Sequence, residues 1–258
     1  MTWIPDRNEL APGVTVERRT ILWAPLAIAA AMLRPAVGQE RVQGDPRRPG
    51  GPPHGGAVLE WDEFIRLCPA DAVAFARDAS EIGQDAYLNR IAAWAVRIKA
   101  APDTKLGAFQ GLDPKVEFGP SFRGVPFAVI QWRMAPHAVL PAHCHPQASV
   151  CTVGMEGEAR VRHFEIHGPA PAFDSGTRTP FLMRETRSQI VAPRRISTLS
   201  ATRDNIHYFE AGDAGARGLD ITTAYGGDGS FSFVAFQPDK PKDPKQGLFE
   251  AVWTGMKL

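Results

Sequence analysis

This sequence has almost no net charge and no long apolar run. Its 258 residues carry 29 Lys or Arg against 28 Asp or Glu, a formal net charge of +1. Such a balance gives no electrostatic case for binding nucleic acid, which needs a concentrated positive surface. No uninterrupted apolar stretch reaches the roughly 18 residues of a membrane-spanning helix, so none is predicted.

Cysteine is also scarce. The three cysteines, Cys68, Cys144 and Cys151, are an odd number whose spacing fits no zinc ribbon or finger. No disulfide framework is implied, although a single bridge stays open in an oxidising compartment.

Glycine and proline, by contrast, are plentiful, with 24 and 23 residues, and 44% of the chain is hydrophobic. This composition favours a turn-rich β protein over a helical bundle. The length allows one sizeable core with additional helices or a tail.

The N-terminus has the features of an export address. Arg18-Arg19 precedes a short apolar stretch, residues 21–33, and small residues follow at 36–38. This combination resembles a bacterial twin-arginine export signal over residues 1–38. It implies a periplasmic or secreted mature protein with no stable membrane association after cleavage. A chance Arg-Arg pair before a helix, or an uncleaved anchor, is the alternative.

Three further segments follow from the pattern. Residues 39–57 form a Pro/Gly-rich linker, residues 58–105 form two or three helices, and residues 106–258 form a β barrel with a C-terminal tail. Pro69 is expected to break the first helical run. Short runs of period two predict strands at 127–134, 148–153, 159–166, 196–201, 205–211, 219–224 and 230–236.

Two loops and a C-terminal segment complete this prediction. A hairpin is expected to turn at Gly157, and residues 168–187 are expected to form a loop, for which a flap over one rim is one interpretation. Residues 248–253 form a short apolar piece that is expected to dock on the barrel.

The most informative motif is His143-Cys144-His145, with His207 in a later strand. Side chains alternate along a strand, so the two histidines of the motif point to one face and Cys144 to the other. His207 could complete a metal-binding face, because imidazole is a common transition-metal ligand near neutral pH. Chance spacing of seven histidines in buried or surface positions is the alternative.

The surrounding residues resemble a known family. Residues 134–146 are similar to the metal-binding strand of the plant cysteine oxidase and cysteamine (2-aminoethanethiol) dioxygenase family of cupins, and residues 205–209 to its third-ligand segment. The resemblance covers roughly residues 109–238. It implies a mainly β fold, a cupin (double-stranded β-helix, jelly-roll) barrel with N-terminal helices, and Fe(II) bound by His143, His145 and His207.

Two departures from this pattern bear on the chemistry. An ordinary cupin has a glutamate a few residues after His-x-His, whereas residues 147–150 here are Gln-Ala-Ser-Val. The missing carboxylate argues for a site of three histidines. Residues 231–236 replace a segment like Cys-Thr-Tyr-Tyr, which argues against a cysteine–tyrosine crosslink.

The resemblance also implies roles for two pocket residues. Asp220 would bond a ligand histidine or the substrate amine, and Tyr225 would donate to bound oxygen or substrate; a rim aspartate and a packing aromatic are the alternatives. His163 is expected at the surface or in a hairpin. Cys151 is expected to be a small core residue.

The function implied by the resemblance is an Fe(II)- and O2-dependent thiol dioxygenase. Its partners would be O2 and a small thiol or N-terminal cysteine, which becomes a sulfinic acid. A periplasmic cupin of another class, either a carbon-substrate dioxygenase, an isomerase or a non-enzymatic binding protein, is the alternative. Nothing in the sequence indicates a further organic cofactor or an oligomeric state.

Overall fold

The structure is a computed structural model that describes residues 58–77, 79–109, 111–173, 178–225 and 231–257. The predicted export segment, residues 1–38, and the predicted linker, residues 39–57, lie outside the described residues. No described helix has both the length and the apolar character needed to cross a membrane.

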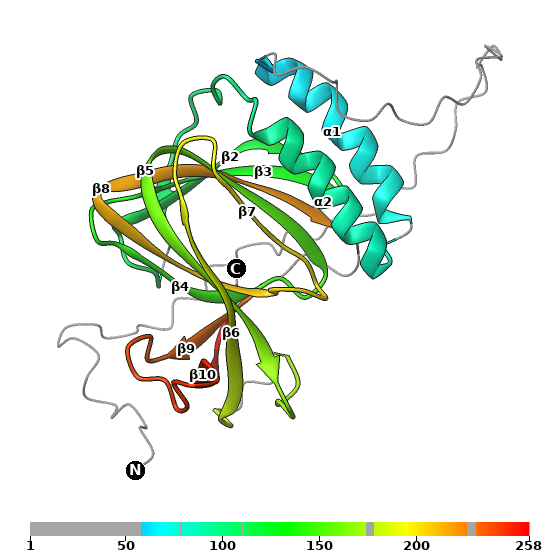
Figure 1. Ribbon diagram of the computed structural model, residues 1–258. Coiled ribbons are helices and arrows are strands. Elements are labelled where there is room, and N and C mark those ends of the chain that lie inside the picture. Colours follow the sequence, from blue (N-terminus) through cyan, green and yellow to red (C-terminus); the bar gives the residue numbers. More distant parts are fainter. Residues whose placement is uncertain (1–57, 78, 110, 174–177, 226–230, 258) are drawn as a thin grey trace, which may run out of the picture. The chain divides into compact units, whose positions relative to one another are not determined.

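Two helices are followed by strands (Figure 1). The helices are α1 (Trp61–Ala76) and α2 (Glu81–Ala95). The strands are β1 (Gly107–Ala108), β2 (Val116–Arg123), β3 (Phe127–Met134), β4 (Val139–Cys144), β5 (Ala148–His167), β6 (Phe181–Val191), β7 (Ile196–Leu199), β8 (Ile206–Ala224), β9 (Ser232–Phe236) and β10 (Leu248–Lys257).

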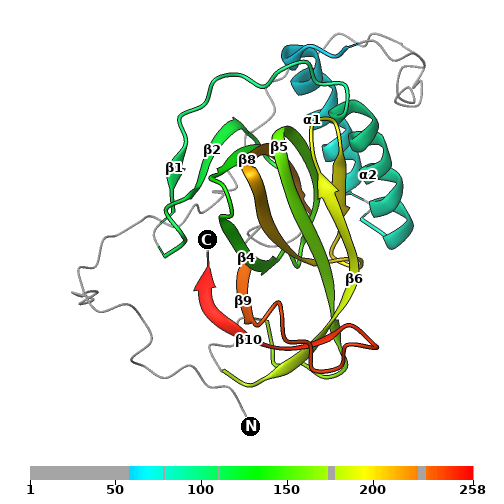
Figure 2. The ribbon, with the colours of Figure 1, turned by 60° about the vertical axis from the view of Figure 1, so that its left-hand side comes forward.

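The strands form one sheet that closes on itself. Its order is β1-β2-β3-β8-β4-β9-β10-β6-β5-β7, and an additional pairing of β8 with β5 completes the ring. Figure 2 shows β5 and β8 running beside each other through this barrel. Full closure leaves the ring strands no free edge. The predicted fold class, a mainly β cupin-type jelly-roll barrel with N-terminal helices, is confirmed.

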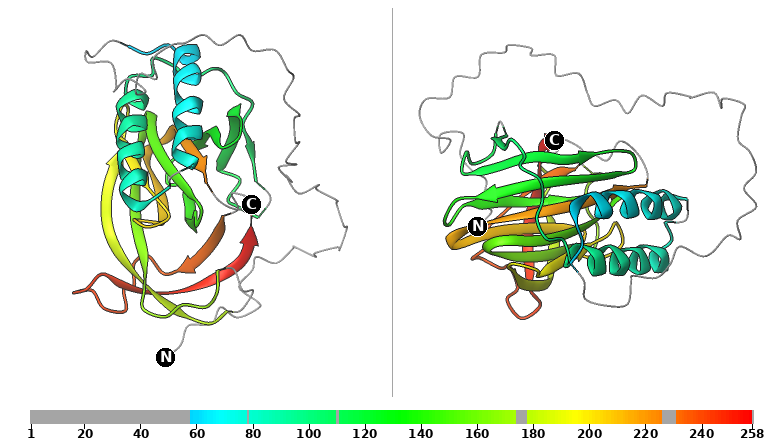
Figure 3. Two further views of the ribbon diagram at one scale, coloured as in Figure 1. Left: turned by 90° about the vertical axis from the view of Figure 1, so that its right-hand side faces the viewer. Right: turned by 90° about the horizontal axis from the view of Figure 1, so that it is seen from above.

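The helices cover one outer face of the barrel (Figures 1 and 3). Ser80 caps the start of α2 by accepting a hydrogen bond from Gly83 N at 3.2 Å. Side chains from both helices pack against outward-facing residues of three strands: Phe127 and Val129 of β3, Cys151 and Val153 of β5, and Leu219 and Ile221 of β8. The opposite parity on these strands therefore points into the barrel.

The predicted break at Pro69 is wrong, because α1 continues through Pro69 to its end at Ala76. Phe64, Cys68 and Phe75 keep one buried stripe on both sides of the proline. Packing of this stripe on the barrel offsets the hydrogen bond that proline cannot donate.

The predicted hairpin at Gly157 is also wrong. β5 runs on from Ala148 to His167, and β8 (Ile206–Ala224) likewise joins the two strands expected at 205–211 and 219–224. Both strands bend together, with register shifts around Gly154 to Ala159. At the bend Gly157 has φ +59°, and a Cβ there would meet Gly215 O at 2.1 Å, so a glycine is needed for close approach and not for chain reversal.

Two strands replace other predicted irregular pieces. Residues 181–187 of the expected loop belong to β6 (Phe181–Val191), which pairs with β5 and β10. The apolar C-terminal segment is β10, which pairs with β9 as well as β6. β6 exposes Arg184, Thr186, Ser188 and Ile190 at alternate positions while Phe181 and Met183 are buried, a half-buried pattern that is weak in sequence.

Candidate metal centre

Three neighbouring strands place histidines at one level of the barrel. His143 of β4 lies opposite His207 of β8 in the strand register, and His207 lies opposite His163 of β5. On the far side of β4, His143 pairs with Phe233 of β9. A continuous row across β9, β4, β8 and β5 is thus formed by Phe233, His143, His207 and His163, in that order. His145 follows β4 directly and lies next to this row.

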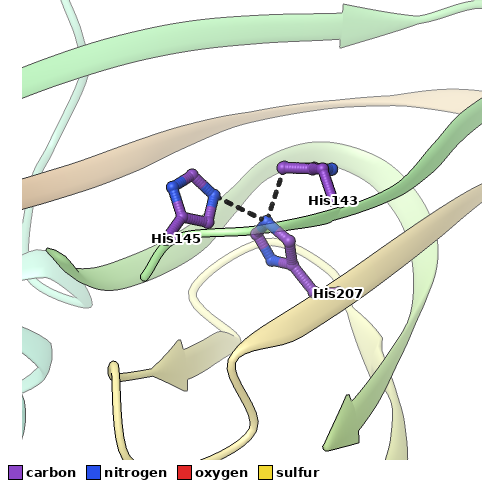
Figure 4. Close-up of side chains that lie close together, drawn as sticks. All are labelled: His143, His145 and His207. Carbon is purple, nitrogen blue, oxygen red and sulfur yellow. Dashed lines mark hydrogen bonds between the residues drawn. The ribbon is translucent and has the colours of Figure 1, made fainter. Parts of the chain in front are cut away.

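The predicted ligand nitrogens converge. Figure 4 shows the His143, His145 and His207 rings turned toward one another. His207 Nε2 is 2.7 Å from His143 Nε2 and 3.2 Å from His145 Nε2. One ligand nitrogen from each of the three lies within 4.8 Å of the others, and all three residues are buried. The structure therefore brings together the three histidines that the sequence predicts as ligands.

These imidazoles are held in the neutral form. Burial lowers the pKa of His143 to about 4, although its bond to Pro141 partly opposes this. Burial also lowers the pKa of His145 and His207 well below the usual value, and the neighbouring imidazoles add to the effect. A neutral imidazole has the free lone pair that a metal needs, so the site is prepared for coordination at ordinary pH.

A backbone carbonyl orients the ring of one ligand, and Asn205 holds the backbone of another. His143 Nδ1 lies 2.9 Å from Pro141 O, so it carries the proton and donates it there, which leaves Nε2 as the free donor atom. Asn205 Nδ2 donates to His145 O at 2.9 Å and to Ser200 O at 3.0 Å, and His145 N donates to Asn205 O at 3.4 Å. Asn205 therefore ties the ligand after β4 to the start of the strand that carries His207.

The prediction that His163 lies at the surface or in a hairpin is wrong. It is buried within β5 behind His207, with 6.1 Å between the two ring centroids. Its Nε2 is 2.5 Å from Ser197 Oγ and its Nδ1 is 3.3 Å from Asp204 O. Arg187 approaches the same Nε2 at 3.4 Å, so Nε2 accepts and Nδ1 donates. Burial and Arg187 lower the pKa of His163 to about 4. Both ring nitrogens are engaged away from the triad, so His163 supports His207 rather than adding a fourth donor.

Asp220 lies on β8 with the inward-facing parity. Its Oδ1 accepts hydrogen bonds from Thr152 Oγ1 at 2.6 Å and from Trp132 Nε1 at 3.3 Å. Burial raises the pKa of Asp220 to about 6, and the two hydrogen bonds partly oppose this rise. Trp132 packs on Phe209, which packs on His207, so Asp220 reaches the triad through two aromatic rings and not by a recorded bond.

Tyr225 lies with the helices. Its hydroxyl donates to Gln84 Oε1 of α2 at 2.9 Å and accepts from Ala201 N at 3.1 Å. Its ring meets Phe75 of α1 edge-on at 5.3 Å. This is the packing alternative that the sequence left open, and it brings Tyr225 into the helix–barrel contact rather than together with the three histidines.

Three phenylalanines that the sequence does not assign to the site surround the triad. Phe209 lies 4.7 Å from His207, Phe233 lies 5.5 Å from His143, and Phe231 lies 5.5 and 5.3 Å from His143 and His145, measured between ring centroids. The sequence does contain one sign of this aromatic wall. Phe231 and Phe233 occur at alternate positions, where side chains of a strand share a face. The site is therefore aromatic as well as buried.

The cysteines take no part in the centre. All three are free and buried. Cys144 packs with Ile206 and Trp253 on the other side of β4, as predicted, and Cys151 belongs to the core beneath the helices. None of them joins the group of possible metal ligands found in the described residues.

A cavity of about 470 Å³ lies away from the three histidines. It is lined by Lys115, Glu117, Arg133, Glu156 and Arg217, with Met134 in its wall, and it contains none of the three histidines. Its volume would suit a ligand. We nevertheless place the candidate centre at the triad. Converging neutral donor atoms indicate metal coordination, whereas an open cavity lined by ion pairs indicates no particular chemistry.

The donor set fits a divalent transition metal. Three neutral nitrogens on one face leave three positions free on an octahedral ion. Imidazole accepts iron, zinc, copper and nickel alike, so the ligands alone do not select the metal. No carboxylate stands in residues 147–150, in agreement with a site of histidines only.

Comparison with known proteins shows a distant likeness of fold. No family model matches the chain, and no curated protein resembles it in sequence. KdgF from Halomonas sp. is 11% identical over 45% of this chain and 85% of its own, with a TM-score of 0.32. The Schizosaccharomyces pombe Cnp3 cupin domain is 13% identical over 48% and 72%, with a TM-score of 0.34.

An oxalate oxidase gives similar values: 16% identity over 49% of this chain and 59% of its own, with a TM-score of 0.35. These solved structures are cupin-fold proteins. Likeness at this level carries no argument about activity. The cupin-type fold of this chain rests on its own strand order, closure and histidine placement.

Proposed function

We propose that this protein is an Fe(II)-dependent thiol dioxygenase. It would convert a small thiol or an N-terminal cysteine to a sulfinic acid, RSH + O2 → RSO2H, so that both oxygen atoms end on sulfur and no other reductant is needed. The observation that carries the proposal is the buried cluster of three neutral imidazoles without a carboxylate.

The charge of the ligand set supports this reaction class. Three neutral ligands leave a divalent ion its full positive charge, which favours an anionic partner such as a thiolate. Bound iron would supply the redox chemistry and the Lewis acidity of the site. His143, His145 and His207 would hold the ion, with the Pro141 carbonyl orienting the first of them.

Other residues of the chain would position the reactants and exclude water. Asn205 keeps His145 in place through its backbone, and His163 packs behind His207. Asp220, with its hydrogen bonds from Thr152 and Trp132, would supply a carboxylate to a substrate amine at the inner wall. The phenylalanines around the triad would keep bulk water away from the reacting atoms.

One observation favours a different cupin chemistry. The triad is surrounded by aromatic rings, and such a wall suits a carbon substrate as well as a thiol. A dioxygenase of carbon substrates is therefore the second candidate. Product mass separates the two, because only the thiol reaction adds two oxygens to sulfur.

The test combines metal analysis with oxygen uptake. Purified protein loaded with Fe(II) is expected to hold one iron and to consume O2 with at least one thiol of a panel that contains cysteamine, cysteine, 3-mercaptopropionate, an N-terminal cysteine peptide, 1-propanethiol and 2-phenylethanethiol. His207→Ala should lose both iron and uptake. His167→Ala, which changes an exposed histidine on β5, is the matched control and should keep both. Stoichiometric iron without oxidation of any thiol would contradict the proposal.

We also propose that the protein works outside the cytoplasm. Its support is Arg18-Arg19, the apolar residues 21–33 and the small residues that follow. Replacing both arginines with lysine should leave the protein in the cytoplasmic fraction of a bacterial host. Equal distribution of the two forms would count against the export proposal and leave the metal site untouched.

A further inference from the structure

The three phenylalanines at the triad differ in exposure. Phe209 and Phe233 are each 1% exposed and belong to the inner core together with Trp132 and Leu140. Phe231 is partly exposed, yet its ring lies against both His143 and His145 and meets Phe233 edge-on at 5.8 Å. Phe231 is therefore at the boundary between solvent and the buried ligand nitrogens, where an entering molecule would touch it.

Two charged side chains near this level, Arg187 and Asp220, have polar partners of their own. Arg187 donates to Thr198 O at 2.7 Å and lies 3.1 Å from Asp204, on the far side of His163 from the triad. Asp220 is bonded by Thr152 and Trp132. Among the described residues, the recorded ring contacts of the triad are with histidine and phenylalanine.

This environment discriminates between thiol tails. A carboxylate brought against buried aromatic rings loses its hydration. Among the described residues, no recorded cation lies over the ring of Phe209, Phe231 or Phe233 to offset that loss. Methylene or phenyl groups gain by leaving water and packing on the rings. A tail that is apolar next to the sulfur therefore fits the wall, and a tail that ends in a carboxylate does not.

We propose that Phe231 determines the specificity of the site and that the substrate is a thiol with an apolar or aromatic tail and no carboxylate. This inference rests on the proposed function and narrows its substrate class. Phe231 acts by contact with the tail, while the histidines hold the metal, so changing Phe231 should alter preference among thiols more than metal binding.

The experiment measures thiol binding to the cobalt(II)-substituted protein, through the absorption band of cobalt–thiolate bonding, without turnover. Two comparisons isolate the tail. 1-Propanethiol and 3-mercaptopropionate share a three-carbon skeleton and differ in the carboxylate. 2-Phenylethanethiol adds an aromatic ring to a short chain. We expect 1-propanethiol to bind at least about tenfold tighter than 3-mercaptopropionate, and 2-phenylethanethiol tighter still.

Variants assign the preference to the ring. Phe231→Ala should reduce the advantage of 2-phenylethanethiol over 1-propanethiol by about tenfold, and Phe231→Leu should retain part of it. Phe122→Ala is the matched control, because Phe122 is also a partly buried phenylalanine but packs on the helix side of the barrel. If Phe231→Ala loses cobalt, the wild-type ranking and Phe231→Leu decide the question.

The outcomes separate this inference from the proposed function. Equal affinity for 3-mercaptopropionate and 1-propanethiol would overturn the inference, as would a Phe231→Ala variant that weakens every thiol alike. Failure of every thiol to give a cobalt–thiolate band would also overturn the inference. If the expected ranking appears but the iron form oxidises no thiol, the dioxygenase proposal fails while the binding preference stands.

Discussion

Two regions of one barrel invite comparison, the histidine triad and the ion-paired cavity. The triad is buried, its imidazoles are neutral and its neighbours are aromatic. The cavity is open and lined by charges that pair with one another, Arg217 with Glu156 at 2.8 Å and Arg133 with Glu117. A volume of about 470 Å³ makes the cavity a candidate ligand site. Desolvation and converging donor atoms nevertheless favour the triad as the reactive centre. They prepare its imidazoles for a reaction that solvated ion pairs cannot support.

The largest expected effect comes from removing the metal. A metal that binds only the folded protein adds about 4 kcal/mol to the free energy of unfolding when its concentration is a thousandfold above the dissociation constant. Chelation should therefore lower the melting temperature of the wild type by several degrees. His145→Ala should show no such shift, because one of three converging donors is missing.

The cavity supplies the control for that measurement. Arg217→Ala removes the Arg217–Glu156 pair, of which the glutamate side chain is 67% exposed, and the 2.7 Å hydrogen bond from Arg217 to buried Gln131. Its own cost in stability should be about 1–3 kcal/mol, mostly from the lost bond to Gln131, and it leaves the three histidines unchanged. The metal-dependent shift should remain complete in this variant. The opposite result would contradict this expectation. If the change in melting temperature on chelation vanished in Arg217→Ala and persisted in His145→Ala, the metal would bind in the cavity and not at the triad.

A smaller effect is expected from His163→Ala. This change leaves Ser197 Oγ and Asp204 O without their partner in a buried place and opens a cavity behind His207, which should reduce the free energy of unfolding by about 2–3 kcal/mol. Loss of support for a ligand should weaken metal binding about tenfold.

Urea unfolding and metal titration would measure both effects of His163→Ala. His163→Gln, which keeps polar groups in the space, should recover part of the metal affinity. His167→Ala is the exposed control on the same strand and should change neither quantity. Unaltered metal affinity in His163→Ala would mean that the ring is core packing only.

The sequence predicts the triad better than its surroundings. His143, His145 and His207 stand out because few side chains bind metals and their spacing places them on one face. The burial of His163 is not predicted, because Phe164 beside it is buried as well. The alternation that marks a half-buried strand is therefore lost at this point. Tyr225 follows the face that α2 covers, and no local pattern shows where a helix docks.

The bends of β5 and β8 show the same limit for the fold. Clusters of glycine at 154–157 and 212–218 predict turns, and they do allow the chain to change direction. The chain continues as strand because its partner bends in step, which is a property of two segments far apart in sequence. Local sequence patterns thus predict most strands. They do not show whether two predicted strands are joined into one long strand.

The smallest expected effect, and the most selective, is that of Asp220→Asn. Burial raises the pKa of Asp220 from its ordinary 3.8 to about 6, so the folded protein binds this proton more tightly than the unfolded chain. The wild type therefore loses stability as pH rises from about 4 to about 6, and above that range the loss is complete.

Asparagine keeps an acceptor for Thr152 and Trp132 without the charge. Asp220→Asn should be more stable than the wild type by about 1–3 kcal/mol at pH 8, and the difference should fade below about pH 4. Urea unfolding at several pH values measures this. Asp213→Asn, at a fully solvated carboxylate beside His137, is the control and should show no such trend. Lower stability of Asp220→Asn at pH 8 would contradict the expectation. A gain in stability joined to slower O2 uptake would instead mean that the barrel keeps a desolvated charge for its chemistry, which the ion-paired cavity does not require.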